Sequence, residues 1–387
     1  MKTQRKIHIY DTTLRDGSQG EGISFSGTSK IQMALKLDEF GVDYIEGGYA
    51  GSNPKDMEFF REIRKHTLRH ARVAAFGSTR RADTTVGEDD NVRRLIEATT
   101  PVVTIFGKSW QLHVTDVLRT TAAENRKMVF ETVRYLKDQG REVVFDAEHF
   151  FDGYKDSPSF ALDVLKAAFE AGADSLVLCD TNGGSLPHEV YGITSEVVKA
   201  FPLAVGIHTH NDSGLAVANS LEAVRAGAVQ VQGTINGYGE RTGNANLCSV
   251  IPALELKMGC RALPEGSLSH VKALSIFADD LVNLRHDAKA PYVGASAFSH
   301  KAGMHVNAVQ KNPRSFEHVT PDSVGNERRI LISEGSGASS VLLKAIEMGV
   351  GLNKSSPEVK EILEALKSLE KQGYSYEAAD ASFKLLV

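Results

Sequence analysis

The sequence contains few cysteines. Cys179, Cys248 and Cys260 are the only ones among 387 residues, and no two of them form a Cys-x-x-Cys group. Three widely spaced cysteines are too few for a disulfide framework, and none lies close enough to another to suggest a zinc site built from thiolates. We therefore expect all three to be reduced and structural.

The sequence also lacks a long apolar run and a surplus of basic residues. No stretch approaches the ~20 apolar residues that span a membrane, and the charged residues 1–6 are not followed by the core of a signal peptide. Lys and Arg together number 44 against 49 Asp and Glu, so the net charge of -5 offers no attraction for nucleic acid. We expect a cytoplasmic protein that binds neither membranes nor nucleic acids.

The sequence is instead of ordinary globular composition, and short β-rich runs alternate with helical patterns along it. Its 42% hydrophobic and 24% charged residues permit a sizeable core. Strands are predicted at residues 7–11, 44–46, 72–76, 101–106, 142–146, 175–179, 204–207 and 229–234. An open doubly wound sheet usually stops at about five or six strands, so eight strand-helix units favour a TIM (β/α)8 barrel.

Polar residues follow every predicted strand, where barrel enzymes build their active sites. His208 and His210 end the seventh unit two residues apart, so both imidazoles should point to one side. With Asp16 after strand one they would form a nitrogen and oxygen ligand set, and Asn244 could add a carbonyl oxygen. Such a set suits Mn, Mg, Zn, Co or Fe, whereas the simpler alternative is two hydrogen-bonded histidines at a strand end. Arg15 could stabilise an oxyanion beside the metal.

Three motifs carry a family resemblance: residues 10–17 (YDTTLRDG), 208–212 (HTHND) and 239–245 (GERTGNA). Together they resemble the signature of the acyltransferase and lyase barrels that include the isopropylmalate, homocitrate and citramalate synthases. Residues 107–110, 146–153 and 299–305 are most similar to the citramalate synthases of this family. The resemblance extends over essentially the whole chain. It implies an acyltransferase of isoleucine biosynthesis that condenses acetyl-CoA with pyruvate to give (R)-citramalate and CoA.

The resemblance also implies roles for individual residues. The ligands of a divalent metal ion (Mn, Mg, Zn or Co) would be Asp16, His208, His210 and, closer or more distant, Asn244. Substrate would be held by Arg15 at the ketone oxygen and Thr181 at the carboxylate, with Phe106 and Asp146 as candidate walls of the pyruvate pocket. Glu148 would take a proton from the acetyl methyl group, and His305 would reach in from a neighbouring subunit. A packing or capping histidine in a linker is the alternative for His305.

Beyond the barrel the pattern becomes less regular. We predict a catalytic barrel domain at residues 1–265, a linker or lid segment with subdomain I at 266–325, and a helical subdomain II at 326–387. Helices are expected at 269–284, 338–348 and 356–372, the last with an amphipathic stripe typical of packing. The resemblance implies a homodimer whose linker covers the partner's barrel. Because the sequence ends at Val387, we expect the regulatory domain of inhibited relatives to be absent and the enzyme to be insensitive to isoleucine and leucine.

Several alternatives stay open. Isopropylmalate and homocitrate synthases share the metal site and differ in the 2-oxo acid. Hydroxymethylglutaryl-CoA lyase uses the same barrel, but its cysteine-bearing loop after strand eight is absent from residues 237–240. A metal-binding barrel without turnover is a third alternative. Relatives commonly carry a tyrosine where Phe316 stands, and the missing hydroxyl favours a barrel without turnover. The intact Arg15, Glu148 and His305 argue against that alternative.

Overall fold

The computed structural model describes residues 4–51, 54–333, 335–353, 356–377 and 379–387. The chain divides into two compact units, residues 1–286 and residues 287–387. The first unit includes the helix α10 (Val271–Leu281), which packs against α1 (Gly27–Phe40).

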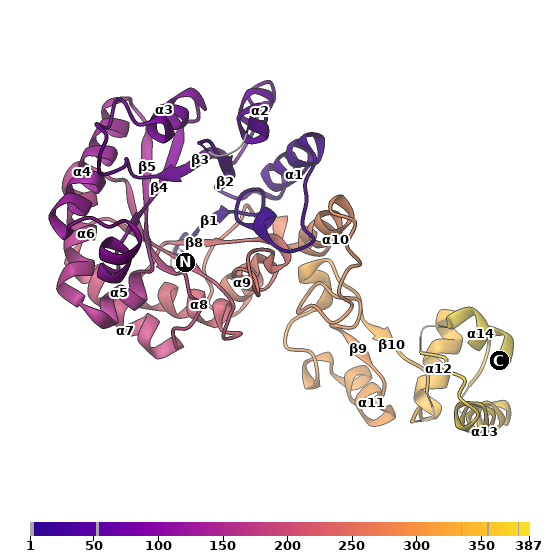
Figure 1. Ribbon diagram of the computed structural model, residues 1–387. Coiled ribbons are helices and arrows are strands. Elements are labelled where there is room, and N and C mark those ends of the chain that lie inside the picture. The colour runs from indigo at the N-terminus through magenta and orange to yellow at the C-terminus, as the bar shows by residue number, and fades with distance from the viewer. Residues whose placement is uncertain (1–3, 52–53, 334, 354–355, 378) are drawn as a thin grey trace. The chain divides into compact units, whose positions relative to one another are not determined.

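The first unit is a TIM barrel, as predicted (Figure 1). Among the described residues, eight parallel strands follow one another in chain order around the barrel, and β1 pairs with β8 to close it. The strands are β1 (His8–Asp11), β2 (Tyr44–Tyr49), β3 (Arg72–Ser78), β4 (Val102–Lys108), β5 (Glu142–Glu148), β6 (Ser175–Asp180), β7 (Ala204–Thr209) and β8 (Gln230–Gly233).

Helices cover the outside of the barrel, one after each strand (Figure 1). They are α1 (Gly27–Phe40), α2 (Pro54–Ile63), α3 (Asp90–Glu97), α4 (Ala122–Asp138), α6 (Pro158–Ala171), α7 (Pro187–Ala200), α8 (Ala216–Ala226) and α9 (Leu247–Leu256). Local sequence explains their ends. The Ser26 hydroxyl accepts a hydrogen bond from the Ser29 amide at the start of α1, and Gly41 ends that helix with a left-handed φ of 96°.

The barrel interior changes from apolar to polar toward the carboxyl ends of the strands. A buried apolar cluster comprises Tyr10, Ala74, Val102, Val144, Val177 and Cys179. Asp146 follows Val144 by two residues and therefore projects on the same side of β5, one layer nearer the strand ends. Asp146 and Cys179 both line a cavity at this end of the barrel, so its wall is partly polar and partly apolar.

Short helical segments that the sequence pattern did not predict shape the rim above the strands. These are η1 (Gly17–Gln19), the π-helix η2 (His113–Val117), α5 (Phe150–Asp156) and η3 (Ile235–Gly237). α5 begins directly after β5, because His149 adopts a left-handed φ of 57° and turns the chain within one residue. Another short segment, η4 (Ser267–His270), precedes α10.

The second unit is mainly helical, as predicted. It contains β9 (Ser299–His300), α11 (Gly303–Lys311), η5 (Pro313–Ser315), η6 (Pro321–Val324), β10 (Arg329–Ile330), α12 (Ala338–Glu347), α13 (Glu358–Lys371) and α14 (Asp380–Leu386). The predicted stripe of α13 packs through Val359, Ile362 and Leu366 into a cluster with Val341 and Phe383. No helix in the described ranges is long and apolar enough to cross a membrane.

Candidate active site

A cavity of about 430 Å³ lies at the carboxyl ends of the barrel strands, and most of the residues predicted from the sequence line it. The predicted residues in its wall are Arg15, Asp16, Phe106, Asp146, Glu148, Thr181, His208 and His210. The barrel therefore brings together residues that are almost two hundred positions apart in the sequence. Asn244 is buried beside this group, whereas His305 belongs to the second unit.

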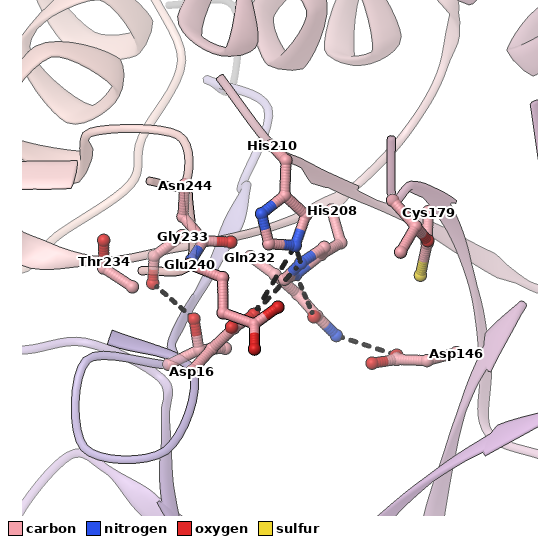
Figure 2. A network of polar contacts seen from close by, with 12 residues as sticks. Asp16, Asp146, Cys179, His208, His210, Gln232, Gly233, Thr234, Glu240 and Asn244 are labelled. Atoms are coloured by element: carbon pink, nitrogen blue, oxygen red, sulfur yellow. Dashed lines mark hydrogen bonds and ion pairs between the residues drawn. The ribbon is translucent and has the colours of Figure 1, made fainter. Parts of the chain in front are cut away.

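Asp16, His208 and His210 converge on one point (Figure 2). Oδ2 of Asp16 lies 3.3 Å from Nε2 of His208 and 3.9 Å from Nε2 of His210. The two Nε2 atoms are 3.3 Å apart, and all three side chains are buried. His208 is the penultimate residue of β7, so the i, i+2 spacing places both rings on one side, as the sequence indicated.

This donor set fits a divalent cation. Two imidazole nitrogens and a carboxylate oxygen face one another within 4.8 Å, which is the arrangement that a shared ion would stabilise. Asn244 pairs with His210 through an isolated β-bridge, and its amide nitrogen donates to the Tyr238 carbonyl at 3.0 Å. Its Oδ1 atom is buried and has no hydrogen-bond partner among the described residues, so it is available as a further ligand.

The charges of the site are strongly coupled. Burial opposes ionisation of Asp16, but Arg15 and His208 outweigh it and hold the pKa of that carboxyl well below its usual range. Burial together with the nearby His208 lowers the pKa of His210 to about 4. Asp16 is thus an anion and His210 a neutral imidazole at neutral pH, the protonation states in which each side chain binds a metal.

Arg15 is held rigidly at the edge of the cavity. Its Nε donates to Oε2 of Glu46 at 2.5 Å, and its guanidinium lies 3.7 Å from the centre of the Phe76 ring. Glu46 is fully buried and also accepts a hydrogen bond of 2.8 Å from the Tyr10 hydroxyl. NH1 of Arg15 is 3.4 Å from Oδ2 of Asp16, so the guanidinium presents its positive charge beside the cluster of Asp16, His208 and His210.

Thr181 is fixed by the loops around it. Its hydroxyl oxygen accepts a hydrogen bond of 2.8 Å from the His149 amide, so its proton is free to point into the cavity. The Arg241 guanidinium donates to the Thr181 carbonyl at 2.7 Å and to both carboxylate oxygens of Asp212 at 2.7 and 2.9 Å. Arg241 therefore ties together the loops that follow β6, β7 and β8.

Glu148 forms an ion pair with Lys108 at the cavity wall. The pair follows from strand register, because Lys108 and Glu148 are aligned partners on β4 and β5. The Glu148 side chain keeps 24% of its surface exposed, so a substrate can reach its carboxylate. The Lys108 ammonium also lies 5.3 Å from the centre of the Phe106 ring.

Phe106 and Asp146 line the cavity, as expected for candidate walls. Phe106 stacks on Phe76 with the ring centres 5.4 Å apart. Burial, reinforced by the nearby Glu46, raises the pKa of Asp146 to about 7. One Asp146 oxygen accepts a hydrogen bond of 2.9 Å from the Gln232 amide, whose own oxygen is 3.0 Å from Nδ1 of His208 (Figure 2).

His305 lies on α11 in the second unit, exposed and stacked on Phe316 with ring centres 4.2 Å apart. Phe316 is itself 48% exposed.

Sequence reasoning assigned no role to Glu46, Lys108 or Gln232. Lys108 is the last residue of β4, and Glu46 lies within β2. Gln232 lies within β8, in the pattern Gln230-Val-Gln232 that marks one face of a strand. The alternation indicates that Gln230 and Gln232 share one face of the strand. The residues that Gln232 contacts on other strands cannot be identified without the strand register.

The chain is similar to known proteins along nearly all of its length. The HMGL-like family model matches residues 6–275, and a model described as homocitrate synthase post-HMGL domain-like matches residues 292–374. The chain belongs to the HMGL-like family. Among HMGL-like relatives, an (R)-citramalate synthase from Aquifex aeolicus is 56% identical over 99% of this chain and 72% of the relative. An (R)-citramalate synthase from Geobacter sulfurreducens is 53% identical over 98% of this chain and 72% of the relative. A probable 2-isopropylmalate synthase from Methanopyrus kandleri is 36% identical over 95% of this chain and 70% of the relative.

Solved structures share the HMGL-like fold. An HMG-CoA lyase from Bacillus subtilis superposes with a TM-score of 0.62 at 18% identity, over 74% of this chain and 97% of that one. At this level of identity the likeness concerns the fold alone. The resemblance read from the three sequence motifs is confirmed at the level of the family.

Proposed function

We infer that the protein is an (R)-citramalate synthase, an acyltransferase that condenses acetyl-CoA with pyruvate. The observation that carries this inference is the convergence of Asp16, His208 and His210 with Arg15 and Glu148 in one cavity. Five relatives named (R)-citramalate synthase, at 49–56% identity over nearly the full chain, support pyruvate as the acceptor over other 2-oxo acids.

We propose that Asp16, His208, His210 and Asn244 hold a divalent metal ion. When bound, the ion supplies Lewis-acid polarisation of the acceptor carbonyl. The identity of the ion follows from geometry and availability rather than from these ligands alone, since Mn, Mg, Zn and Co all accept nitrogen and oxygen donors.

Arg15 and Thr181 would orient pyruvate. The Arg15 guanidinium faces the cavity beside Asp16, where it can donate to a ketone oxygen that gains negative charge as the new carbon-carbon bond forms. The Thr181 hydroxyl, which already accepts from the His149 amide, would donate its proton to the pyruvate carboxylate. The aromatic ring of Phe106 would pack against the methyl group.

Glu148 would act on the acetyl group. Its carboxylate, directly or through a water molecule, would take a proton from the methyl carbon of acetyl-CoA, and that carbon would then attack the ketone carbon of pyruvate. Lys108, paired with Glu148, keeps the carboxylate in place while the substrate approaches. Hydrolysis of the citramalyl thioester would release CoA and make the reaction irreversible.

We further propose that the enzyme is a homodimer and that His305 of each subunit reaches the barrel of the other. Exposure of the stacked His305 and Phe316 rings supports an interface role. Phe316 would contribute only an apolar surface there, whereas a tyrosine would add a hydroxyl.

The function is tested by the release of CoA from acetyl-CoA with pyruvate, 2-oxoisovalerate or 2-oxoglutarate as acceptor. We expect the rate with pyruvate to exceed the other two and to fall on treatment with a chelator. Added Mn²⁺ or Mg²⁺ should restore it. A faster rate with either larger acid would replace the assignment by another member of the family, and a rate that resists complete metal removal would reject the metal-dependent mechanism.

A further inference from the structure

Gln232 lies directly behind the proposed metal site and contacts one of its ligands. It is aligned with His208 across the β7–β8 pair, so both side chains project into the barrel at the same level. Its Oε1 is 3.0 Å from Nδ1 of His208, the ring nitrogen that faces away from Asp16 (Figure 2). Gln232 is fully buried.

Asp146 determines which way the Gln232 amide points. The amide nitrogen donates to Oδ1 of Asp146 at 2.9 Å. An ionised Asp146 can only accept hydrogen bonds, so in that state the NH2 group of Gln232 faces Asp146 and its carbonyl oxygen faces His208. A carbonyl oxygen is also an acceptor only, so Nδ1 of His208 must carry the proton of the neutral ring.

We propose that Gln232 and Asp146 form a positioning relay that fixes the tautomer of His208. With the ion bound, the relay, which rests on the proposed metal site, would leave Nε2 of His208 without a proton, and that atom faces Asp16 and His210. Metal-bound histidines generally need such a partner at the other ring nitrogen, and removal of the partner typically weakens metal affinity about 10- to 100-fold. Asp146 would thereby support the metal site as well as line the pyruvate pocket.

The relay can be tested by Mn²⁺ binding alone, with no acetyl-CoA or pyruvate present. Gln232→Met removes the acceptor with little change in shape, and Gln230→Met is the matched control. Gln230 lies two residues earlier on the same face of β8, is also buried, with 4% of its surface exposed, and is not among the residues that line the cavity. Free Mn²⁺ would be measured by electron paramagnetic resonance in the full-length chain, and thermal melting of the metal-free variants would check folding.

We expect Gln232→Met to raise the Kd for Mn²⁺ about 10- to 100-fold and Gln230→Met to change it less than about twofold. A second variant, Gln232→Glu/Asp146→Asn, exchanges the two partners. The carboxylate at position 232 then accepts a hydrogen bond from Nδ1 of His208, and the amide at position 146 donates to that carboxylate. This variant should bind Mn²⁺ at least as tightly as the wild type.

Equal losses in the two methionine variants, or no loss in either, would overturn the relay. A tenfold loss in the exchanged variant would also overturn it, even if Gln232→Met failed to fold, because the exchange keeps every hydrogen bond. Failure of the relay is distinguishable from failure of the proposed function, since wild-type turnover of pyruvate does not depend on the outcome.

Discussion

The buried pair of Arg15 and Glu46 allows catalytic and structural effects of one residue to be separated. Arg15 contacts Glu46 at 2.5 Å, and the two side chains are 10% and 0% exposed. Replacing Arg15 by Gln leaves Glu46 as a buried charge without its cation. Breaking a buried ion pair in this way costs about 3–5 kcal/mol of the free energy of unfolding, whereas replacing both partners by neutral groups is often nearly neutral.

Activity should follow a different pattern from stability. If Arg15 donates to the developing alkoxide, its loss lowers kcat about 10²- to 10³-fold, or ~2.7–4 kcal/mol, whichever residue stands at position 46. We therefore expect Arg15→Gln to lose both stability and activity, and Arg15→Gln/Glu46→Gln to regain stability while activity stays low. Urea unfolding of the metal-free protein gives the first quantity, and CoA release at saturating substrates and Mn²⁺ gives the second.

Two results would refute this reasoning. A double variant with wild-type kcat would show that the Arg15 charge is not needed in the reaction. An Arg15→Gln variant as stable as the wild type would show that Glu46 is not left as a costly unpaired charge. Glu46→Gln serves as the matched control: Arg15 keeps the neighbouring Asp16 at 3.4 Å, so the loss of stability should be smaller than in Arg15→Gln.

Two further predictions concern the dimer and the pH dependence of stability. Coexpression of the Glu148→Gln chain with the His305→Ala chain should restore about a quarter of the wild-type rate. Random mixing makes half of the dimers mixed, and each mixed dimer has one of its two sites intact. If no activity is restored, His305 does not act in the partner's site. Burial raises the pKa of Asp11 to about 7 despite hydrogen bonds from Thr13. The folded protein then holds a proton that the unfolded chain has released between about pH 4 and 7, so this residue reduces stability as the pH rises, by up to ~1.4 kcal/mol per unit. Unfolding of Asp11→Asn, measured relative to the wild type, should show a stability difference that increases across this window; a constant difference would contradict the raised pKa.

The local sequence was sufficient for much of the fold. The eight alternating units predict the barrel because each strand and helix carries its own periodicity and end signals, such as Gly41 after α1. The local sequence does not predict α5 and α11, because both helices are short and lie in stretches without clear helical periodicity. α5 also depends on the left-handed conformation of His149, which is uncommon for a residue other than glycine.

The chemical groups of the site, and the family to which the chain belongs, follow from the sequence alone. The spacing of His208 and His210 predicts that their side chains point to the same side of the strand. The motif around Asp16 identifies the relatives. Which of these groups come into contact depends on how the strands close into the barrel. Closure of β1 onto β8 brings Asp16 to the histidines, and strand register pairs Lys108 with Glu148 and Gln232 with His208. A shift of one residue would turn each of these side chains to the other face of its strand, and no local pattern fixes that register across strands far apart in the chain.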